Sequence, residues 1–187
     1  MSQDKKTRLR DIIARESLLT GNNFTLASGK SSAYFFDMKK TMFHPEGASL
    51  IADLIFEAIK DDKDVAYIGG LEMGAVPVIS GVCMRSWPER PISGFFVRKQ
   101  VKDHGTSKLI DGRLEPGKSV ILLEDVTTTG GSVMKAVEAA RAQGCTVKKI
   151  VTIVDRLEGA RDNLKKEGLE LVALFTRDDF APKSPKP

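Results

Sequence analysis

Two carboxylates, a run of hydroxyl side chains and a pair of glycines follow one another within residues 120–132. Four aliphatic residues, 120–123, predict a buried strand, and Glu124 and Asp125 come directly after it. Glycine allows a backbone N–H to approach a ligand closely, hydroxyls add donors, and a helix N-terminus carries a partial positive charge. The segment from Thr127 to Ser132, placed before a predicted helix, therefore favours binding of a phosphate group.

Other phosphate-binding motifs do not fit this segment. A P-loop would place lysine directly after its second glycine, but Ser132 follows Gly131, and no Gly-x-Gly-x-x-Gly turn is present. Two carboxylates facing a phosphate would repel it, so we expect Glu124 and Asp125 to accept hydrogen bonds from sugar hydroxyls. The alternative is that they and the hydroxyls only cap the next helix, although a cap requires one such residue and not six.

A basic segment, residues 98–113, is the second candidate for chemistry. It contains Arg98, Lys99, Lys102 and His104 within seven residues. Cations there could stabilise a leaving diphosphate, and a mobile loop could close over a site to exclude water. A solvated basic loop is the alternative. The chain has 29 Lys plus Arg against 25 Asp plus Glu, a net charge of +4, and residues 98–108 hold 4 − 1 = +3 of it.

The 120–132 segment resembles the signature of the type I phosphoribosyltransferases, which bind 5-phosphoribosyl 1-diphosphate. The resemblance implies that Glu124 and Asp125 contact the ribose hydroxyls. It also implies that the following residues bind this donor: Val126, Thr127, Thr128, Thr129, Gly130, Gly131 and Ser132.

The basic segment, from Arg98 to Gly105, resembles the catalytic loop of one branch of that family, the orotate phosphoribosyltransferases, where the loop acts across a homodimer interface. This implies that Arg98, Lys99, Lys102 and His104 contact the diphosphate. Lys99, Lys102, His104 and Asp125 are then the implied catalytic residues.

Two further segments concern the base. Residues 24–37 are similar to the N-terminal motif of the orotate enzymes, in which paired aromatic residues, here Phe35 and Phe36, present backbone groups to the pyrimidine; an ordinary core strand is the alternative. Arg156 follows a predicted strand and suits bidentate binding of a carboxylate, which orotate carries. In the resembling family this arginine and the middle threonine, Thr128, contact orotate. A surface salt bridge of Arg156 is the competing explanation.

The resemblance implies an Mg²⁺-dependent pentosyltransferase that makes orotidine 5-phosphate and diphosphate in pyrimidine (UMP) biosynthesis. Mg²⁺ would be held by diphosphate, ribose and water, with no direct protein ligand expected. Ala27 and Met73 depart from the pattern, because many relatives have lysine there; Lys30 could replace the first cation. Alternatives are a phosphoribosyltransferase for another base, a non-catalytic ligand sensor and a nucleic-acid-binding protein.

Predicted strands alternate with predicted helices along the chain, and this order predicts an α/β fold with a mainly parallel sheet flanked by helices. Expected helices cover 4–19 and 75–84, begin at Pro45 and after the turn at 127–132, and cover 158–167. Expected strands cover 34–36, 65–68, 92–97, 119–123, 147–154 and 169–175. We expect a single domain, 1–187, with a small N-terminal hood at 1–40, a mobile loop at 98–113 and a disordered tail at 177–187.

Composition excludes several other classes of protein. The 187 residues are 41% hydrophobic, as in ordinary globular proteins. Two histidines, and two cysteines without Cys-x-x-Cys spacing, argue against a zinc site or a disulfide framework and favour reduced, buried thiols. No signal peptide and no membrane-spanning segment is predicted. We therefore expect a cytoplasmic protein with small-molecule substrates and with neither a membrane nor a nucleic acid as partner.

Overall fold

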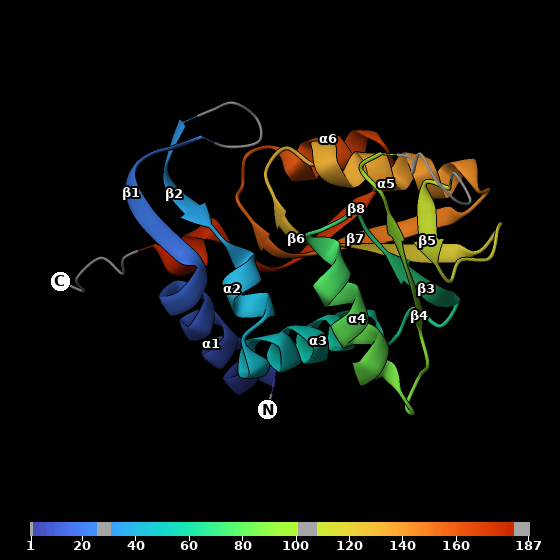
Figure 1. Cartoon of the computed structure of the whole chain (residues 1–187), viewed down its shortest axis with the longest axis horizontal. Coiled ribbons are helices and arrows are strands. Elements are labelled where there is room, and N and C mark those ends of the chain that lie inside the picture. Colours follow the sequence, from blue (N-terminus) through green and yellow to red (C-terminus); the bar gives the residue numbers. More distant parts are fainter. Residues whose placement is uncertain (1, 26–30, 101–107, 182–187) are drawn as a thin grey trace.

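The main sheet has six strands, in the order β5-β4-β3-β6-β7-β8 (Figure 1). The structure, a computed structural model, describes residues 2–25, 31–100 and 108–181. β3 to β8 are, in turn, Val65–Gly69, Ser93–Val97, Ile110–Gly112, Ser119–Thr127, Thr146–Asp155 and Glu170–Thr176. All neighbouring pairs are parallel except β4 and β5, which are antiparallel. The mainly parallel α/β sheet expected from the sequence is confirmed.

Helices cover both faces of this sheet (Figure 1). Successive side chains of a strand point to opposite faces, so Ile121 and Leu123 of β6 join one core cluster, whereas Val120 and Leu122 join the other. The first cluster packs under α3 (Pro45–Ile59) and α4 (Ala75–Ser86), and the second under α5 (Gly131–Ala142) and α6 (Ala160–Lys166). β6 is thus buried on both sides.

The N-terminal region forms the expected hood. α1 (Ser2–Ile12) continues through a single π-helical turn, Ile13–Ser17, into β1 (Leu18–Thr25), which pairs antiparallel with β2 (Ser31–Phe36). The expectation of one helix over 4–19 is wrong at its end, because backbone pairing of Leu18 and Leu19 with β2 places them in a strand. α2 (Met38–Met42) follows, and the buried hydroxyls of Ser17 and Thr41, 2.6 Å apart, join it to the end of the first helix.

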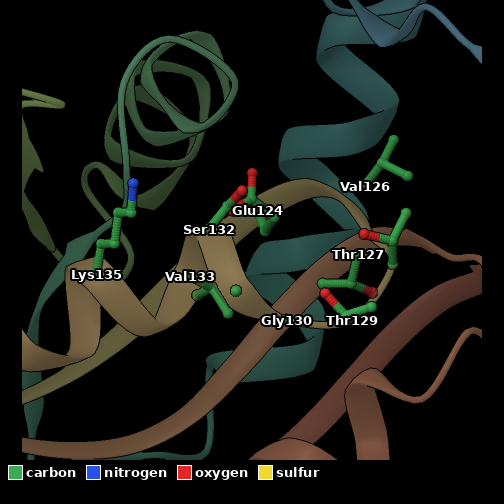
Figure 2. Close-up of a pocket in the computed structure, with 10 residues that line it drawn as sticks. Glu124, Val126, Thr127, Thr129, Gly130, Ser132, Val133 and Lys135 are labelled. Carbon is green, nitrogen blue, oxygen red and sulfur yellow. The ribbon is translucent and has the colours of Figure 1, made fainter. Parts of the chain in front are cut away.

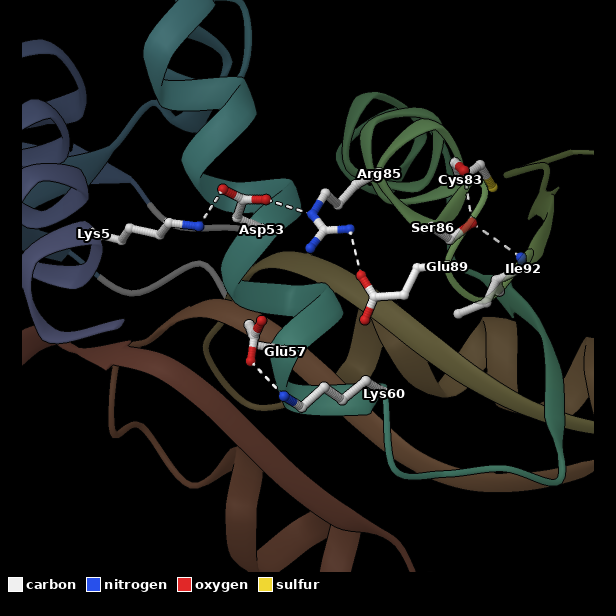
Figure 3. Close-up of polar contacts among 9 residues, drawn as sticks. All are labelled: Lys5, Asp53, Glu57, Lys60, Cys83, Arg85, Ser86, Glu89 and Ile92. Atoms are coloured by element: carbon white, nitrogen blue, oxygen red, sulfur yellow. Dashed lines mark hydrogen bonds and ion pairs between the residues drawn. The ribbon is translucent and has the colours of Figure 1, made fainter. Parts of the chain in front are cut away.

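Ion pairs connect the hood to the first helical layer (Figure 3). The carboxylate of Asp53 in α3 accepts from Lys5 Nζ at 2.7 Å and from Arg85 Nε at 2.6 Å, which joins α1, α3 and α4. Partial burial alone would raise the pKa of Asp53, but these two hydrogen bonds lower it overall. The guanidinium carbon of Arg85 also lies 4.5 Å from the ring centroid of Phe56, so this cation packs on an aromatic ring as well as pairing with Asp53.

The loop and the tail are more structured than expected. Residues 110–112 of the predicted loop form β5, because their backbone pairs with Phe95, Phe96 and Val97 of β4. Residues 177–180 of the predicted tail form a 3₁₀ turn, whose Phe180 ring lies 5.2 Å from that of Phe36 and 5.7 Å from that of Phe175. Aromatic packing against the core therefore orders this turn. Residues 101–107 and 182–187 lie outside the described residues.

Two expectations from composition concern thiols and membranes. Both cysteines are free thiols; Cys145 is buried and Cys83 is partly buried, and burial raises the pKa of the Cys83 thiol. Within the described ranges, no helix is long and apolar enough to cross a bilayer.

Candidate functional site

The loop after β6 lies at the carboxyl edge of the parallel sheet, where ligands bind in open α/β folds. β6 runs further than predicted, through Glu124 and Asp125 to Thr127, since Val126 and Thr127 still pair with Val154 and Asp155 of β7. α5 begins at Gly131, within the predicted turn 127–132 rather than after it. The turn between them uses a left-handed conformation at Gly130, with φ +86°, which a side chain rarely adopts.

The carbonyl oxygens of this loop are bonded to the neighbouring segment 156–163. Thr127 O accepts from Arg156 N at 2.9 Å, and Thr128 O accepts from Ala160 N at 3.1 Å. Asn163 Nδ2 donates to Thr129 O at 3.0 Å. A carbonyl and the following N–H point in opposite directions across a trans peptide. The loop therefore turns its carbonyls toward α6 and leaves the next N–H groups for the other side.

That other side is a cavity of about 380 Å³ (Figure 2). It is lined by Glu124, Val126, Thr127, Thr128, Thr129, Gly130, Gly131, Ser132, Val133 and Lys135. All of the residues predicted for the phosphate loop are thus brought together. The buried hydroxyl oxygen of Thr127 has no hydrogen-bond partner among the described residues, so it is free for a ligand.

Lys135 is a lining residue that sequence reasoning missed. The prediction looked for a lysine directly after Gly131, as in a P-loop, and found none. Lys135 instead follows Ser132 by three residues, so both side chains lie on one face of α5 (Figure 2). A cation three or four residues into the helix that follows such a loop is the signal that would have found it.

Of the two carboxylates, Glu124 lines this cavity, and Asp125 is the next residue along β6. Glu124 is only 6% exposed, and its Oε2 has no hydrogen-bond partner among the described residues. Burial, and then the nearby carboxylate of Asp125, raise the pKa of Glu124 well above its usual value. Asp125 packs on the backbone of Gly74, directly before α4, and its Oδ1 accepts from Val126 N at 2.8 Å. Burial beside Asp125 therefore disfavours the charged form of the Glu124 carboxyl group.

The basic segment is only partly described. Arg98 forms ion pairs with Asp111 of β5 and, at 3.8 Å, with Glu72 Oε2. Lys99 N donates to Glu72 Oε1 at 2.9 Å, and the Lys99 side chain is close enough to act on the pKa of Glu124 in the lowering direction. Lys99 thus lies near the carboxylate pair. Lys102 and His104 lie outside the described residues.

Of the residues predicted to bind the base, Arg156 lies against the hood hairpin that carries Phe35 and Phe36, whereas Thr128 lines the cavity described above. Arg156 is buried and contacts Glu158, the Ser32 hydroxyl and the Tyr34 ring. Phe36 packs in the core with Phe180, so its side chain behaves as an ordinary core residue, while Phe35 is partly buried with its ring 6.0 Å from that of Phe24. The structure therefore brings Arg156 to the hood hairpin, although the two lie far apart in sequence.

Comparison with known proteins agrees with this geometry. Residues 41–180 match the phosphoribosyl transferase domain family. The chain is 47% identical over 180 residues to the orotate phosphoribosyltransferase of Bradyrhizobium diazoefficiens, covering 94% of this chain and 95% of that protein. The chain belongs to the orotate phosphoribosyltransferase family. The enzyme of that name from Methanocaldococcus jannaschii is 44% identical over 173 residues, with 92% and 95% of the two chains covered.

A solved structure extends the family likeness to three dimensions. The orotate phosphoribosyltransferase of Mycobacterium tuberculosis in complex with 5-phospho-alpha-D-ribosyl 1-diphosphate superimposes with a TM-score of 0.77 at 29% identity. The match covers 95% of this chain and 92% of that chain. The type I phosphoribosyltransferase fold expected for this member of the orotate phosphoribosyltransferase family is therefore confirmed.

Proposed function

We propose that this protein transfers the 5-phosphoribosyl group from 5-phosphoribosyl 1-diphosphate to orotate, giving orotidine 5-phosphate and diphosphate for UMP biosynthesis. One observation supports this above all: the cavity lined by residues 126–132, a carboxylate pair and a buried arginine share one edge of the sheet. These three features correspond to the 5-phosphate, the ribose and the orotate carboxylate. Family membership agrees with this assignment.

The reaction breaks the bond between C1 of ribose and the diphosphate oxygen and forms a bond between C1 and a ring nitrogen of orotate. The transition state resembles a ribosyl oxocarbenium ion, so the protein acts by positioning and by electrostatic stabilisation. In this proposal residues 126–132 bind the 5-phosphate, Glu124 and Asp125 bind the ribose hydroxyls, and Arg156 and Thr128 orient orotate. Phe35 and Phe36 supply backbone groups beside the base.

The basic segment completes the proposed site by binding the diphosphate through Arg98, Lys99, Lys102 and His104. Arg98 is already paired with Asp111 and Glu72, so it contributes less free positive charge than its lysine neighbours. We expect Lys102→Ala to lower kcat severely, because the charge that develops on the leaving group loses a partner. A wild-type kcat in this variant would remove Lys102 from the catalytic residues.

Mg²⁺ is the proposed cofactor, held mainly by the diphosphate, the ribose and water; Glu124 Oε2 on the proposed ribose side of the site, unpartnered among the described residues, fits a nearby cation. Magnesium keeps several of its waters and binds substrate phosphates, so the proposed site needs no direct protein ligand. The described part of the chain holds no cluster of three or more His, Cys, Asp or Glu that could hold a metal by itself. When bound, the ion would offset the negative charge of the diphosphate.

A homodimer is proposed as the working assembly, and an exposed apolar surface along α4 supports it. Phe43, Met73, Met84 and Trp87 are 64–79% exposed, and three of them lie along or at the ends of α4. Met84→Lys should shift the protein from dimer to monomer in sedimentation equilibrium, whereas Ala142→Lys on the exposed face of α5 should not. A wild-type mass for Met84→Lys would remove this surface from the interface.

The reaction is tested by following orotate consumption spectrophotometrically with donor and Mg²⁺, in parallel with uracil, hypoxanthine and adenine. Consumption of orotate alone is expected, and use of a purine instead would overturn the base assignment. Asp125→Asn should lower kcat severely without unfolding the protein. Arg156→Ala should raise the KM for orotate far more than the KM for the donor; equal effects would contradict recognition of the carboxylate.

A further inference from the structure

The guanidinium of Arg156 has partners of two different kinds. Its Nε donates to Glu158 Oε1 at 2.9 Å, and its Nη2 donates to Ser32 Oγ at 3.0 Å. Glu158 lies two residues away on the same turn, whereas Ser32 comes from β2 of the hood. Arginine has five N–H donors, so two of them are used in these contacts. The guanidinium carbon also lies 4.4 Å from the ring centroid of Tyr34.

The turn that carries Arg156 and Glu158 is fixed by hydrogen bonds to the buried carboxylate of Asp155. Asp155 is fully buried; its Oδ1 accepts from Leu157 N at 3.0 Å and its Oδ2 from Arg161 Nε at 3.0 Å. These bonds keep Leu157 in the left-handed region, with φ +57°, which a leucine rarely adopts. Arg156 N is bonded to the phosphate loop at Thr127 O. The backbone on either side of the guanidinium is therefore fixed relative to the donor site.

The side chain of Arg156 is only 2% exposed, so an incoming carboxylate has to exchange with one of the present partners. Ser32 is the weaker partner of the two, because its hydroxyl is a neutral acceptor, whereas Glu158 forms an ion pair with the guanidinium. Its hydroxyl also has another bond, which it donates to Tyr34 O at 2.9 Å. Losing Arg156 would thus leave Ser32 satisfied.

We propose that Glu158 is a positioning residue that holds the Arg156 guanidinium in place, and that the Ser32 hydroxyl occupies the position taken by the carboxylate of the base substrate. This inference rests on the proposed function, because it assumes that Arg156 recognises orotate. Glu158 fixes the Nε side of the planar fork, which leaves the Nη groups to a planar carboxylate. Exchange replaces a neutral acceptor by a charged one and leaves the ion pair with Glu158 intact.

The opposite role for Glu158 makes a different prediction. If its negative charge mainly competed with anionic orotate, removing that charge would improve orotate binding in both Glu158→Ala and Glu158→Gln. If it positions Arg156, Glu158→Ala should raise the KM for orotate about tenfold or more, since one charge-assisted hydrogen bond is lost. Glu158→Gln keeps an acceptor for Nε–H and should stay within about threefold of wild type.

The experiment measures KM for orotate and KM for the donor separately, with kcat and Tm, in wild type, Glu158→Ala, Glu158→Gln and Ser32→Ala. The donor KM should change little in all three variants, and Ser32→Ala should leave the orotate KM unchanged or lower it. Glu167→Ala is the matched control, since it removes an exposed ion pair with Arg141 close to α6. It should have wild-type KM values.

Each outcome bears on one of the two proposals. Wild-type protein that does not consume orotate would refute the proposed function itself. Active wild type with an unchanged or lowered orotate KM in Glu158→Ala would refute the positioning role. An orotate KM raised equally in Ser32→Ala and Glu158→Ala would show that Ser32 is a substrate-binding group rather than the exchanged one. A parallel rise of both KM values with a lowered Tm would indicate a merely structural role.

Discussion

The carboxylate of Asp125 packs directly on the backbone of Gly74, so that a Cβ at residue 74 would lie 2.7 Å from Asp125 Oδ1. Gly74 has helical φ and ψ angles of −55° and −42°, which alanine adopts readily. Space, and not backbone conformation, is therefore what requires glycine here. The backbone directly before α4 therefore packs closely against the Asp125 carboxylate of β6, with no room for a side chain between them.

Gly74→Ala should displace Asp125 while leaving the fold intact. We expect a kcat/KM for the donor lowered about tenfold or more, because a shift of about 1 Å in a positioned group has large kinetic effects. Gly81→Ala in the same helix is the control, since its Cβ would be in ordinary contact, 3.5 Å from Ala52. It should raise the free energy of unfolding by about 0.5–1 kcal/mol and keep wild-type kinetics.

Glu124 should make the stability of the ligand-free protein depend on pH. Folding raises the pKa of its carboxyl group above 4.5, chiefly through burial, so the folded protein binds this proton more tightly than the unfolded chain. This contribution is complete below about pH 4.5 and is lost as the pH rises through the folded pKa. Glu124→Gln should thus match wild type near pH 4 and exceed its Tm near pH 8 when both are melted without ligands.

The opposite sign is expected at Asp53. Its pKa is lowered below 3.8 in the folded protein, so its contribution is present above the unfolded pKa and is lost in acid. Asp53→Asn should therefore have a lower Tm than wild type near pH 8 and approach it near pH 3. A Glu124→Gln variant that is less stable than wild type at pH 8 would contradict the cost assigned to burying this carboxylate.

Lys135 should contribute to donor binding through its position in the phosphate cavity. We expect Lys135→Ala to raise the KM for 5-phosphoribosyl 1-diphosphate several-fold and to leave the KM for orotate unchanged, because the lost charge lies beside the phosphate loop. The effect should shrink at high ionic strength, where such an interaction is screened. Lys166→Ala, at the end of α6, is the charge-matched control; equal donor KM values in the two variants would exclude Lys135 from the site.

The C-terminal turn should stabilise the hood. Phe180→Ala removes the ring contacts with Phe36 and Phe175 and should lower the free energy of unfolding by about 2 kcal/mol, less than for a fully buried ring. Asp178→Ala changes an exposed residue of the same turn and should stay within about 0.5 kcal/mol of wild type. Equal stability of the two variants in urea unfolding would show that the turn does not support the hood.

The chemistry of the donor site could be predicted from local sequence, because one contiguous segment carries it. Residues 120–132 supply a buried strand, two carboxylates, hydroxyls and glycines in the order in which the structure uses them. The alternation of strands and helices likewise predicted the parallel sheet, since each element buries its own apolar face. The end of the first helix was misplaced, and the short elements β1, α2 and β5 were not predicted, because pairing with another strand or the geometry of a turn decides them.

What the sequence could not determine depends on residues that are distant along the chain. Nothing local shows that Asp125 packs on Gly74 or that Arg156 bonds to Ser32 across 124 positions. The 3₁₀ turn at 177–180 has a local capping box between Thr176 and Asp179, but its docking depends on the surface that Phe36 and Phe175 offer the Phe180 ring. The sequence pattern thus determined which groups could do the chemistry. Long-range packing decided which partners orient those groups, because contacts between residues far apart in the chain leave no periodic pattern in the sequence.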